Sequence, residues 1–229
     1  MKSINFLLIF LSVFSIGCKN NLEDIPKISK GTISENWQYH NETMKFKLQL
    51  PRDWSFVDNR RGISNFLPMS ENLSENILGN EEVTISKNFN FADESSIYQL
   101  FSISKNSLED IKSGNRKGDL GFAVISSQNG NAEEDIESAK KDILAQLNEN
   151  PEAYKLNEEN LKIKDNLSFG KKDKIPYFRF TIADINGNAT GNRMYAFKNY
   201  GKYNLVILIT YFSEEELITI KNLVESIEN

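Results

Sequence analysis

Apolar and polar residues alternate over several short stretches of the chain, and this period of two is typical of half-buried β-strands. Residues 44–50 (MKFKLQL) place every second side chain, all of them apolar, on one face. Residues 176–182 alternate in the same way, and residues 96–104 and 120–126 are apolar stretches of strand length. We predict a strand in each of these four stretches.

The pattern near the C-terminus predicts a β-hairpin. Residues 192–197 and 203–212 have the character of two strands, joined by a turn at residues 199–202. The second strand (YNLVILITYF) is apolar on both faces, which is typical of a strand in the centre of a sheet. Further short strands are expected at residues 83–85 and 161–169.

Two helix starts carry the sequence of a capping box, in which the first side chain and an acid three residues later each bond a backbone amide. Asn131 and Glu134 open one helix, and Ser213 and Glu216 open the last one. Apolar residues then recur at helical spacing in both segments. Residues 105–119 are polar, and we expect a loop with a short helical turn there.

Three of these stretches together resemble one known family. Residues 46–54, 134–147 and 193–227 are similar to the entry strand, the mid-chain helix and the ending of the PsbP-like superfamily. The resemblance implies an α/β fold of the α+β type, a three-layer α-β-α sandwich with one antiparallel sheet of about six or seven strands and helices on both faces. It implies binding rather than catalysis and carries over no site residues. Residues 59–119 match least, and whether they form an insertion stays open.

The N-terminus has the pattern of a bacterial lipoprotein signal. Lys2 precedes an apolar stretch at residues 4–16, which is shorter than the roughly 20 residues that span a bilayer. Ser15-Ile-Gly-Cys18 resembles the lipobox, in which the signal is cut before a cysteine that is then acylated. The resemblance implies cleavage between Gly17 and Cys18, the only cysteine of the chain. An ordinary secreted protein is the alternative.

This interpretation divides the chain into three parts. Residues 1–17 are a signal peptide, residues 18–36 are the lipidated cysteine with a polar tether, and residues 37–229 form one domain. Lys19 stands where an aspartate would resemble a signal for retention in the inner membrane, so the outer membrane is favoured. Whether the domain faces the periplasm or the cell surface stays open.

Composition narrows the possible functions. The chain has 229 residues, a net charge of −5, one cysteine and one histidine. The negative charge argues against a nucleic-acid partner, and a single cysteine excludes an intramolecular disulfide framework and a cysteine-based zinc site. The sequence contains no nucleophile elbow, P-loop or dinucleotide fingerprint. We therefore expect no catalytic residues, no metal and no cofactor.

Two short basic turns, at residues 59–62 and 115–118, are the candidate binding site in this acidic protein. They carry Arg60, Arg61, Arg116 and Lys117. If the turns lie together, they could bind an anionic headgroup, an acidic polysaccharide or an acidic partner face. The alternative is a pair of solvated turns without a ligand.

Other features have a structural explanation as well as a functional one. His40 is a candidate general base or a strand-entry residue. Residues 184–188 have the composition of a calcium loop without its twelfth-position glutamate, so a turn is favoured. The acidic residues 133–135 and 214–216 suit the first turn of a helix. Five aromatic residues form either a stacking patch or part of the core: Trp37, Tyr39, Trp54, Tyr200 and Tyr203.

Together these patterns predict a membrane-anchored, non-catalytic accessory binding module for an envelope protein or complex. One alternative is a small-ligand carrier, which would have an apolar cavity between sheet and helix. Another is a hydrolase with dispersed carboxylates, which would need a deep pocket holding two or more converging acids.

The lipobox generates a first prediction. Cys18→Ala removes the acylated side chain, so we expect the full-length precursor to accumulate without an acyl chain. Metabolic labelling with a palmitate analogue, together with the shift of the band on a gel, measures both effects. Normal processing and labelling of the variant would contradict the lipoprotein assignment.

Overall fold

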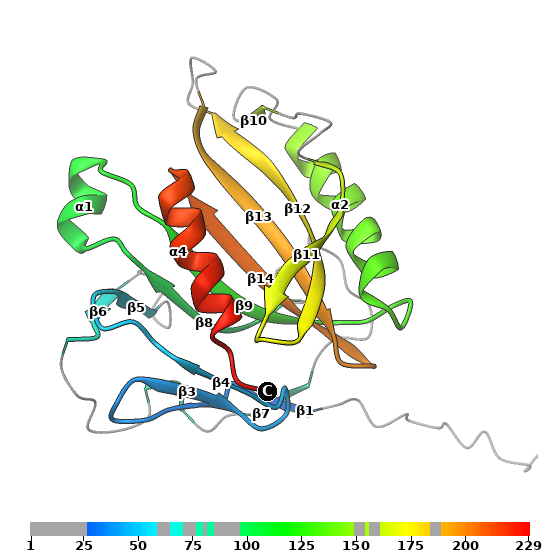
Figure 1. Cartoon of the computed structure of the whole chain (residues 1–229), viewed down its shortest axis with the longest axis horizontal. Coiled ribbons are helices and arrows are strands. Elements are labelled where there is room, and N and C mark those ends of the chain that lie inside the picture. Colours follow the sequence, from blue (N-terminus) through cyan, green and yellow to red (C-terminus); the bar gives the residue numbers. More distant parts are fainter. Residues whose placement is uncertain are drawn as a thin grey trace, which may run out of the picture.

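The computed structural model describes residues 27–58, 65–70, 77–79, 82–84, 97–148, 154–155, 161–183 and 189–229. One large antiparallel sheet forms its centre (Figure 1). Its strands follow the spatial order β10 (Tyr154–Lys155), β12 (Asp173–Ala183), β13 (Ala189–Asn199), β14 (Tyr203–Tyr211), β9 (Asp119–Ser126), β8 (Tyr98–Ser104), β5 (Ser55–Asp58) and β6 (Asn65–Pro68), and β11 (Lys164–Phe169) also pairs with β12.

Strand β14 lies in the middle of this sheet, between β13 and β9. Leu205, Ile207 and Ile209 are fully buried on one face, and Val206 is buried on the other. The predicted hairpin is confirmed, because β13 and β14 pair from Asn199 with Asn204 to Asn192 with Tyr211. The doubly apolar pattern of this segment therefore identified a central strand correctly.

Different layers cover the two faces of the large sheet. On one face lies helix α2 (Ala132–Asn148), whose Ile136, Ala139 and Ile143 pack in a cluster with Phe178 and Phe180. On the other face lie helix α4 (Glu214–Glu225) and a separate three-stranded sheet, made of β2 (Thr32–Ile33), β3 (Gln38–Asn41) and β4 (Phe46–Gln49). Both belong to the main core cluster.

The predicted three-layer α-β-α sandwich is wrong. Within its described residues the protein is mostly β, with a nine-stranded, a three-stranded and a two-stranded sheet and three helices. The layer opposite α2 consists largely of the three-stranded sheet, whose Tyr39 ring centroid lies 4.2 Å from that of Phe101 on β8. Strands β3 (QYHN) and β5 (SFVD) contain only one and two apolar residues, so no alternation of apolar and polar residues marks them in the sequence. Strand β4 has the same length but lies within the predicted alternating stretch 44–50.

The first described segment belongs to the fold and not to a tether. Strand β1 (Lys27–Ser29) pairs with β7 (Glu82–Thr84) in the two-stranded sheet. Ile28 and Ile33 are buried. The Tyr39 hydroxyl donates a hydrogen bond to the carbonyl of Lys30 (2.7 Å). The tether assignment is therefore wrong for residues 27–36, and residues 1–26, including Gly17 and Cys18, lie outside the described part of the chain.

Both long helices start where their capping sequences predict. The amide of Glu134 donates to Oδ1 of Asn131 (2.8 Å), and the amide of Glu216 donates to Oγ of Ser213 (3.2 Å). The short turn expected within residues 105–119 is helix α1 (Leu108–Ser113). Here Ser107 and Asp110 form a complete capping box.

Two kinds of contact fix the C-terminal segment: buried side chains of α4 and backbone hydrogen bonds beyond the helix. Leu217, Ile220 and Val224 of α4 are buried against the large sheet. Beyond the helix, the backbone of Glu228 exchanges two hydrogen bonds with Lys47 on β4, at 2.8 and 2.9 Å. Helix α4 and the chain end therefore connect the large sheet to the small one.

This arrangement predicts that the protein does not fold without its last helix. Deletion of residues 214–229 removes four buried apolar side chains, those of Leu217, Ile220, Val224 and Ile227, and the link to β4, so we expect the cooperative unfolding transition to be lost. Urea denaturation followed by circular dichroism measures it. The control is Ile218→Ala, at a side chain of the same helix that is 58% exposed, which should change stability by less than about 0.5 kcal/mol. A soluble truncated protein with a cooperative transition would contradict the prediction.

Candidate functional site

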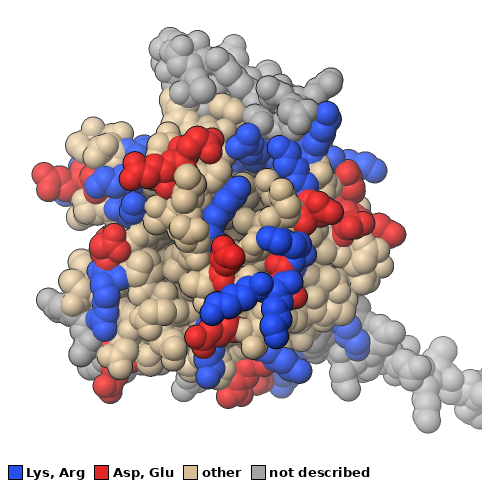
Figure 2. Space-filling view, in the orientation of Figure 1, with Lys and Arg blue, Asp and Glu red and all other residues tan. Residues whose placement is uncertain are grey.

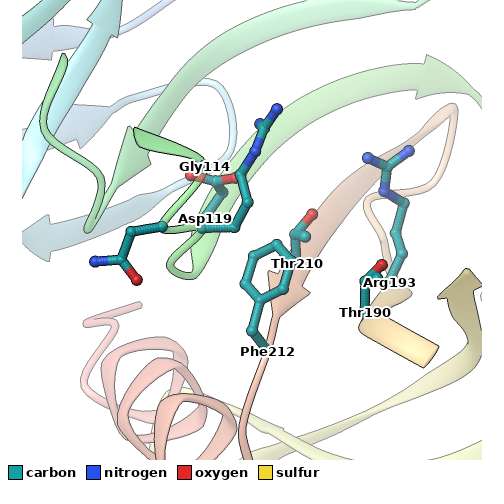
Figure 3. Close-up of a pocket in the computed structure, with 8 residues that line it drawn as sticks. Gly114, Asp119, Thr190, Arg193, Thr210 and Phe212 are labelled. Carbon is teal, nitrogen blue, oxygen red and sulfur yellow. The ribbon is translucent and has the colours of Figure 1, made fainter. Parts of the chain in front are cut away.

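A cleft of about 640 Å³ opens at one end of the central strands. It lies on the face of the sheet that α2 covers. Side chains of β14 alternate between the two faces, so Thr210 lies on the same face as Val206, four residues before it. Val206 packs in the cluster that contains the buried side chains of α2. Figure 3 shows the lining side chains. They are Gly114, Asn115, Arg116, Asp119, Thr190, Arg193, Thr210 and Phe212.

The strand register brings three of these residues into one row. Arg193 on β13 pairs with Thr210 on β14, and Thr210 pairs with Asp119 on β9. Thr210 accordingly lies between Asp119 and Arg193 in Figure 3. The row continues to Ser104 on β8, which pairs with Asp119. Side chains of paired residues on one face are close neighbours, so the sheet itself fixes the spacing of the polar groups.

Buried Asn106 positions the loop that carries Arg116. Its amide nitrogen donates to the carbonyl of Lys117 (2.8 Å) and to Oδ1 of Asp119 (3.1 Å), and its Oδ1 accepts from the amide of Lys117 (2.8 Å). The loop begins at Gly114, which ends α1 in the left-handed conformation (φ 76°). These contacts place Arg116 at the same end of the sheet as Arg193.

An aromatic ring forms part of the cleft wall. A Cβ atom added to Gly191 would lie 2.7 Å from the Phe212 ring, so this ring can lie against β13 only because residue 191 has no side chain. The amide of Phe212 donates to Oε2 of Glu216 (2.8 Å) at the start of α4. Phe212 is half-buried, which leaves part of the ring accessible to a ligand.

Asp119 is a carboxyl group in a partly apolar setting. Burial raises its pKa above the usual value for aspartate. Hydrogen bonds from Ser104 and Asn106 and the positive charges of Arg193 and Arg116 act in the opposite direction but do not cancel the effect of burial. The cleft therefore combines one carboxyl group with two guanidinium groups.

The two guanidinium groups have no anionic partner within the described residues. Asp119 influences Arg116 and Arg193 only at longer range, since no ion pair of 4.0 Å or less joins it to either. Nε of Arg193 is buried and makes no hydrogen bond in the described part of the chain. A buried donor without an acceptor is costly, so this atom favours a ligand that supplies one.

The four basic residues predicted to bind an anion have different surroundings. Arg116 lines the cleft as expected. Lys117 instead forms an ion pair with Asp110 (2.8 Å), and this contact, with the hydrogen bonds from Ser107, holds the pKa of Asp110 well below its usual range. Arg60 and Arg61 lie outside the described residues. Arg193 was missed, and only the pairing register of β13, β14 and β9 brings it beside Arg116.

The described part of the face shown in Figure 2 carries no broad basic surface. On the described face shown in Figure 2, Lys and Arg side chains are interspersed with Asp and Glu side chains. This pattern suits a negatively charged protein in which a basic site is confined to a local cleft.

The described residues among the other candidates from the sequence lie within strands or in the hydrophobic core. His40 is half-buried within β3, opposite Lys47. Trp37, Tyr39 and Trp54 are core residues, at most 3% exposed, so the aromatic stacking patch is wrong for these three. Tyr200 and Tyr203 are half-buried against the main core. The possible turn at residues 184–188 lies outside the described residues.

One of the acidic clusters contains a buried carboxylate. Asp135, in the first turn of α2, is 5% exposed and accepts five hydrogen bonds. The donors are Ser127, Asn204, the Gln128 amide, and the amide and side chain of Asn129. Burial alone would raise the pKa of Asp135, but these donors outweigh it and hold the pKa below its usual value. The group therefore joins α2 to the β13–β14 hairpin.

No group of three or more His, Cys, Asp or Glu residues suitable for a metal ion occurs in the described part of the chain. Over the same residues, no helix has the length and apolar composition needed to cross a bilayer. No model of a known family, no curated protein and no solved structure matches the chain. The resemblance to the PsbP-like superfamily therefore stays a prediction from the sequence, and the site has to be interpreted from its own chemistry.

The Asp135 network generates a stability prediction. Asp135→Asn replaces one of the two accepting oxygens by an NH2 group, which then faces donors of the surrounding residues. We therefore expect the free energy of unfolding to fall by about 2–4 kcal/mol at pH 7. Because the folded-state pKa is depressed, this contribution is present above the unfolded-state pKa of about 3.9 and is lost as the pH falls through the folded-state value. The difference in the free energy of unfolding between wild type and variant should therefore be constant from about pH 5 to about pH 8 and shrink below about pH 4.

Urea denaturation at a series of pH values measures this difference. Asp142→Asn, the same chemical change at an exposed position of α2 outside its first turn, is the matched control and should change stability by less than about 0.5 kcal/mol. Equal effects of the two substitutions at pH 7 would show that Asp135 has no special structural role.

Proposed function

We propose that this protein is a lipid-anchored, non-catalytic binding module of the bacterial cell envelope, and that its cleft binds an anionic group of its partner. The observation that carries the proposal is the pair Arg116 and Arg193. Their guanidinium groups line one cleft from different elements and have no anionic partner among the described residues. Guanidinium groups bind carboxylates and phosphates through paired, charge-assisted hydrogen bonds.

The lining of the cleft supports binding over hydrolysis. Asp119 is the one carboxylate among its described lining residues. A hydrolase with dispersed carboxylates would need at least two that converge on the substrate. Strands hold Asp119, Thr210 and Arg193, and the hydrogen bonds of Asn106 hold the loop that carries Arg116. Such a scaffold suits selective binding.

The short distance to Cys18 supports an accessory role at the membrane. Eight residues lie between Cys18 and Lys27, the first residue of β1. Even fully extended, such a segment spans no more than about 30 Å. If Cys18 is acylated, the folded domain stays within that distance of the bilayer and meets partners at the membrane surface.

Photocrosslinking in living cells tests this function. A photoreactive amino acid at Asn115, an exposed residue of the cleft, should give discrete crosslinked products. The double variant Arg116→Ala/Arg193→Ala should lose them, because both anion-binding groups are gone. The double variant Lys112→Ala/Lys202→Ala, at exposed sites outside the cleft lining, changes the net charge equally and should keep them.

Mass spectrometry of the products identifies the bound component. Melting temperatures of all variants show whether each one is folded. Crosslinks that persist unchanged in a folded Arg116→Ala/Arg193→Ala protein would contradict the proposed function.

A further inference from the structure

The cleft contains more than an anion site, and its remaining groups restrict the ligand. Alongside the two arginines it presents the Asp119 carboxyl, the hydroxyls of Thr190 and Thr210 and the Phe212 ring. Small-molecule sites typically have volumes of about 300–1,000 Å³ and combine a few polar groups with an aromatic surface. The volume of about 640 Å³ falls in this range.

We infer that the ligand is an acidic saccharide, whose carboxylate pairs with Arg193 and Arg116 and whose hydroxyls donate to Asp119. The inference rests on the proposed function and specifies the chemistry of the same site.

Asp119 is the group that distinguishes this ligand from a simple anion. Its oxygens accept hydrogen bonds from Asn106 and Ser104, while a carboxylate offers about four acceptor positions in total. A ligand that carries hydroxyl donors beside its anionic group can use the remaining positions. A sulfate dianion has no donor and a hydrogen phosphate dianion has only one, and the Asp119 charge repels both.

The surroundings of Phe212 add to this discrimination. The carboxylate of Glu216 accepts from the Phe212 amide, so a second negative charge lies close to the cleft wall. The half-buried ring offers an apolar surface against which the C–H face of a sugar ring can pack. A ligand of low charge density with an apolar face fits this wall better than a compact phosphate group.

The net charge of the described lining residues also fits a ligand group with one negative charge. With Asp119 ionised, the two guanidinium groups leave the described lining residues with a single net positive charge. A uronic acid residue carries one negative charge, so it neutralises the cleft without an excess. Because burial raises the pKa of Asp119, this carboxyl group loses its charge at a higher pH than a free aspartate does, and the cleft becomes more positive as the pH falls.

Binding of methyl galacturonoside, a uronic acid with a single negative charge, to the mature lipidated protein in non-ionic detergent tests the inference. Neutral methyl galactoside, inorganic phosphate and an acidic peptide are titrated in parallel by calorimetry. We expect methyl galacturonoside to bind and the other three ligands to bind about tenfold more weakly or not at all. Arg116→Ala changes an exposed side chain, so it should leave the fold intact and weaken binding by about tenfold.

Asp119→Asn separates the two kinds of ligand. Removal of the negative charge should strengthen phosphate binding, whereas loss of a charged acceptor for the sugar hydroxyls should weaken methyl galacturonoside binding. Lys202→Ala is the control that should change neither. Melting curves show which variants are folded.

Each result has a definite meaning. Preferred phosphate or peptide binding that depends on Arg116 would overturn the saccharide inference and leave the proposed function standing. Absence of binding by all four ligands, with crosslinks at Asn115 that still require the arginines, would do the same. Absence of binding together with arginine-independent crosslinks would overturn both.

Discussion

The rest of the structure depends on the burial of strand β14 on both faces. Its alternate side chains enter two separate clusters, with Ile207 and Ile209 in one and Val206 in the other. Because both clusters need covering layers, α2 must pack on one side and α4 with the small sheet on the other. The cleft forms at the end of β14, where the strand no longer carries apolar side chains on the α2 face. Thr210 places a hydroxyl there, and the residues paired with it, Arg193 and Asp119, are polar as well.

A second constraint comes from the aromatic layer between the two main sheets. The rings of Tyr39 and Phe46 on the small sheet pack against Phe101 and Phe122 on the large one, with centroid distances from 4.2 to 5.8 Å. Tyr39 also donates to the Lys30 carbonyl, which holds the N-terminal segment in place. The segment that leads to the proposed anchor is therefore held by the core, so a pull on the anchor would act on the domain directly.

The sequence predicted elements whose pattern is local and failed where distant pairing decides the structure. Capping residues such as Asn131 and Ser213 mark their helices because the contacts they make lie three residues away. Short strands such as β3 and β5 form only through pairing with partners elsewhere, and their sequences (QYHN and SFVD) do not alternate between apolar and polar residues as that of β4 does. The extra strands and the small sheet they build are the reason that the predicted α-β-α sandwich is wrong.

The candidate site shows the same division. Arg116 could be found because it stands in a basic turn within an acidic chain, and a turn is visible in the sequence. Arg193 could not, because it is an isolated arginine in a strand, and its importance follows from its pairing with Thr210, which in turn pairs with Asp119. Since each of these pairings follows from the position of β14, the central strand that organises the core also assembles the cleft. A shift of one residue in its register would turn Thr210 to the opposite face and separate the arginine from the carboxyl.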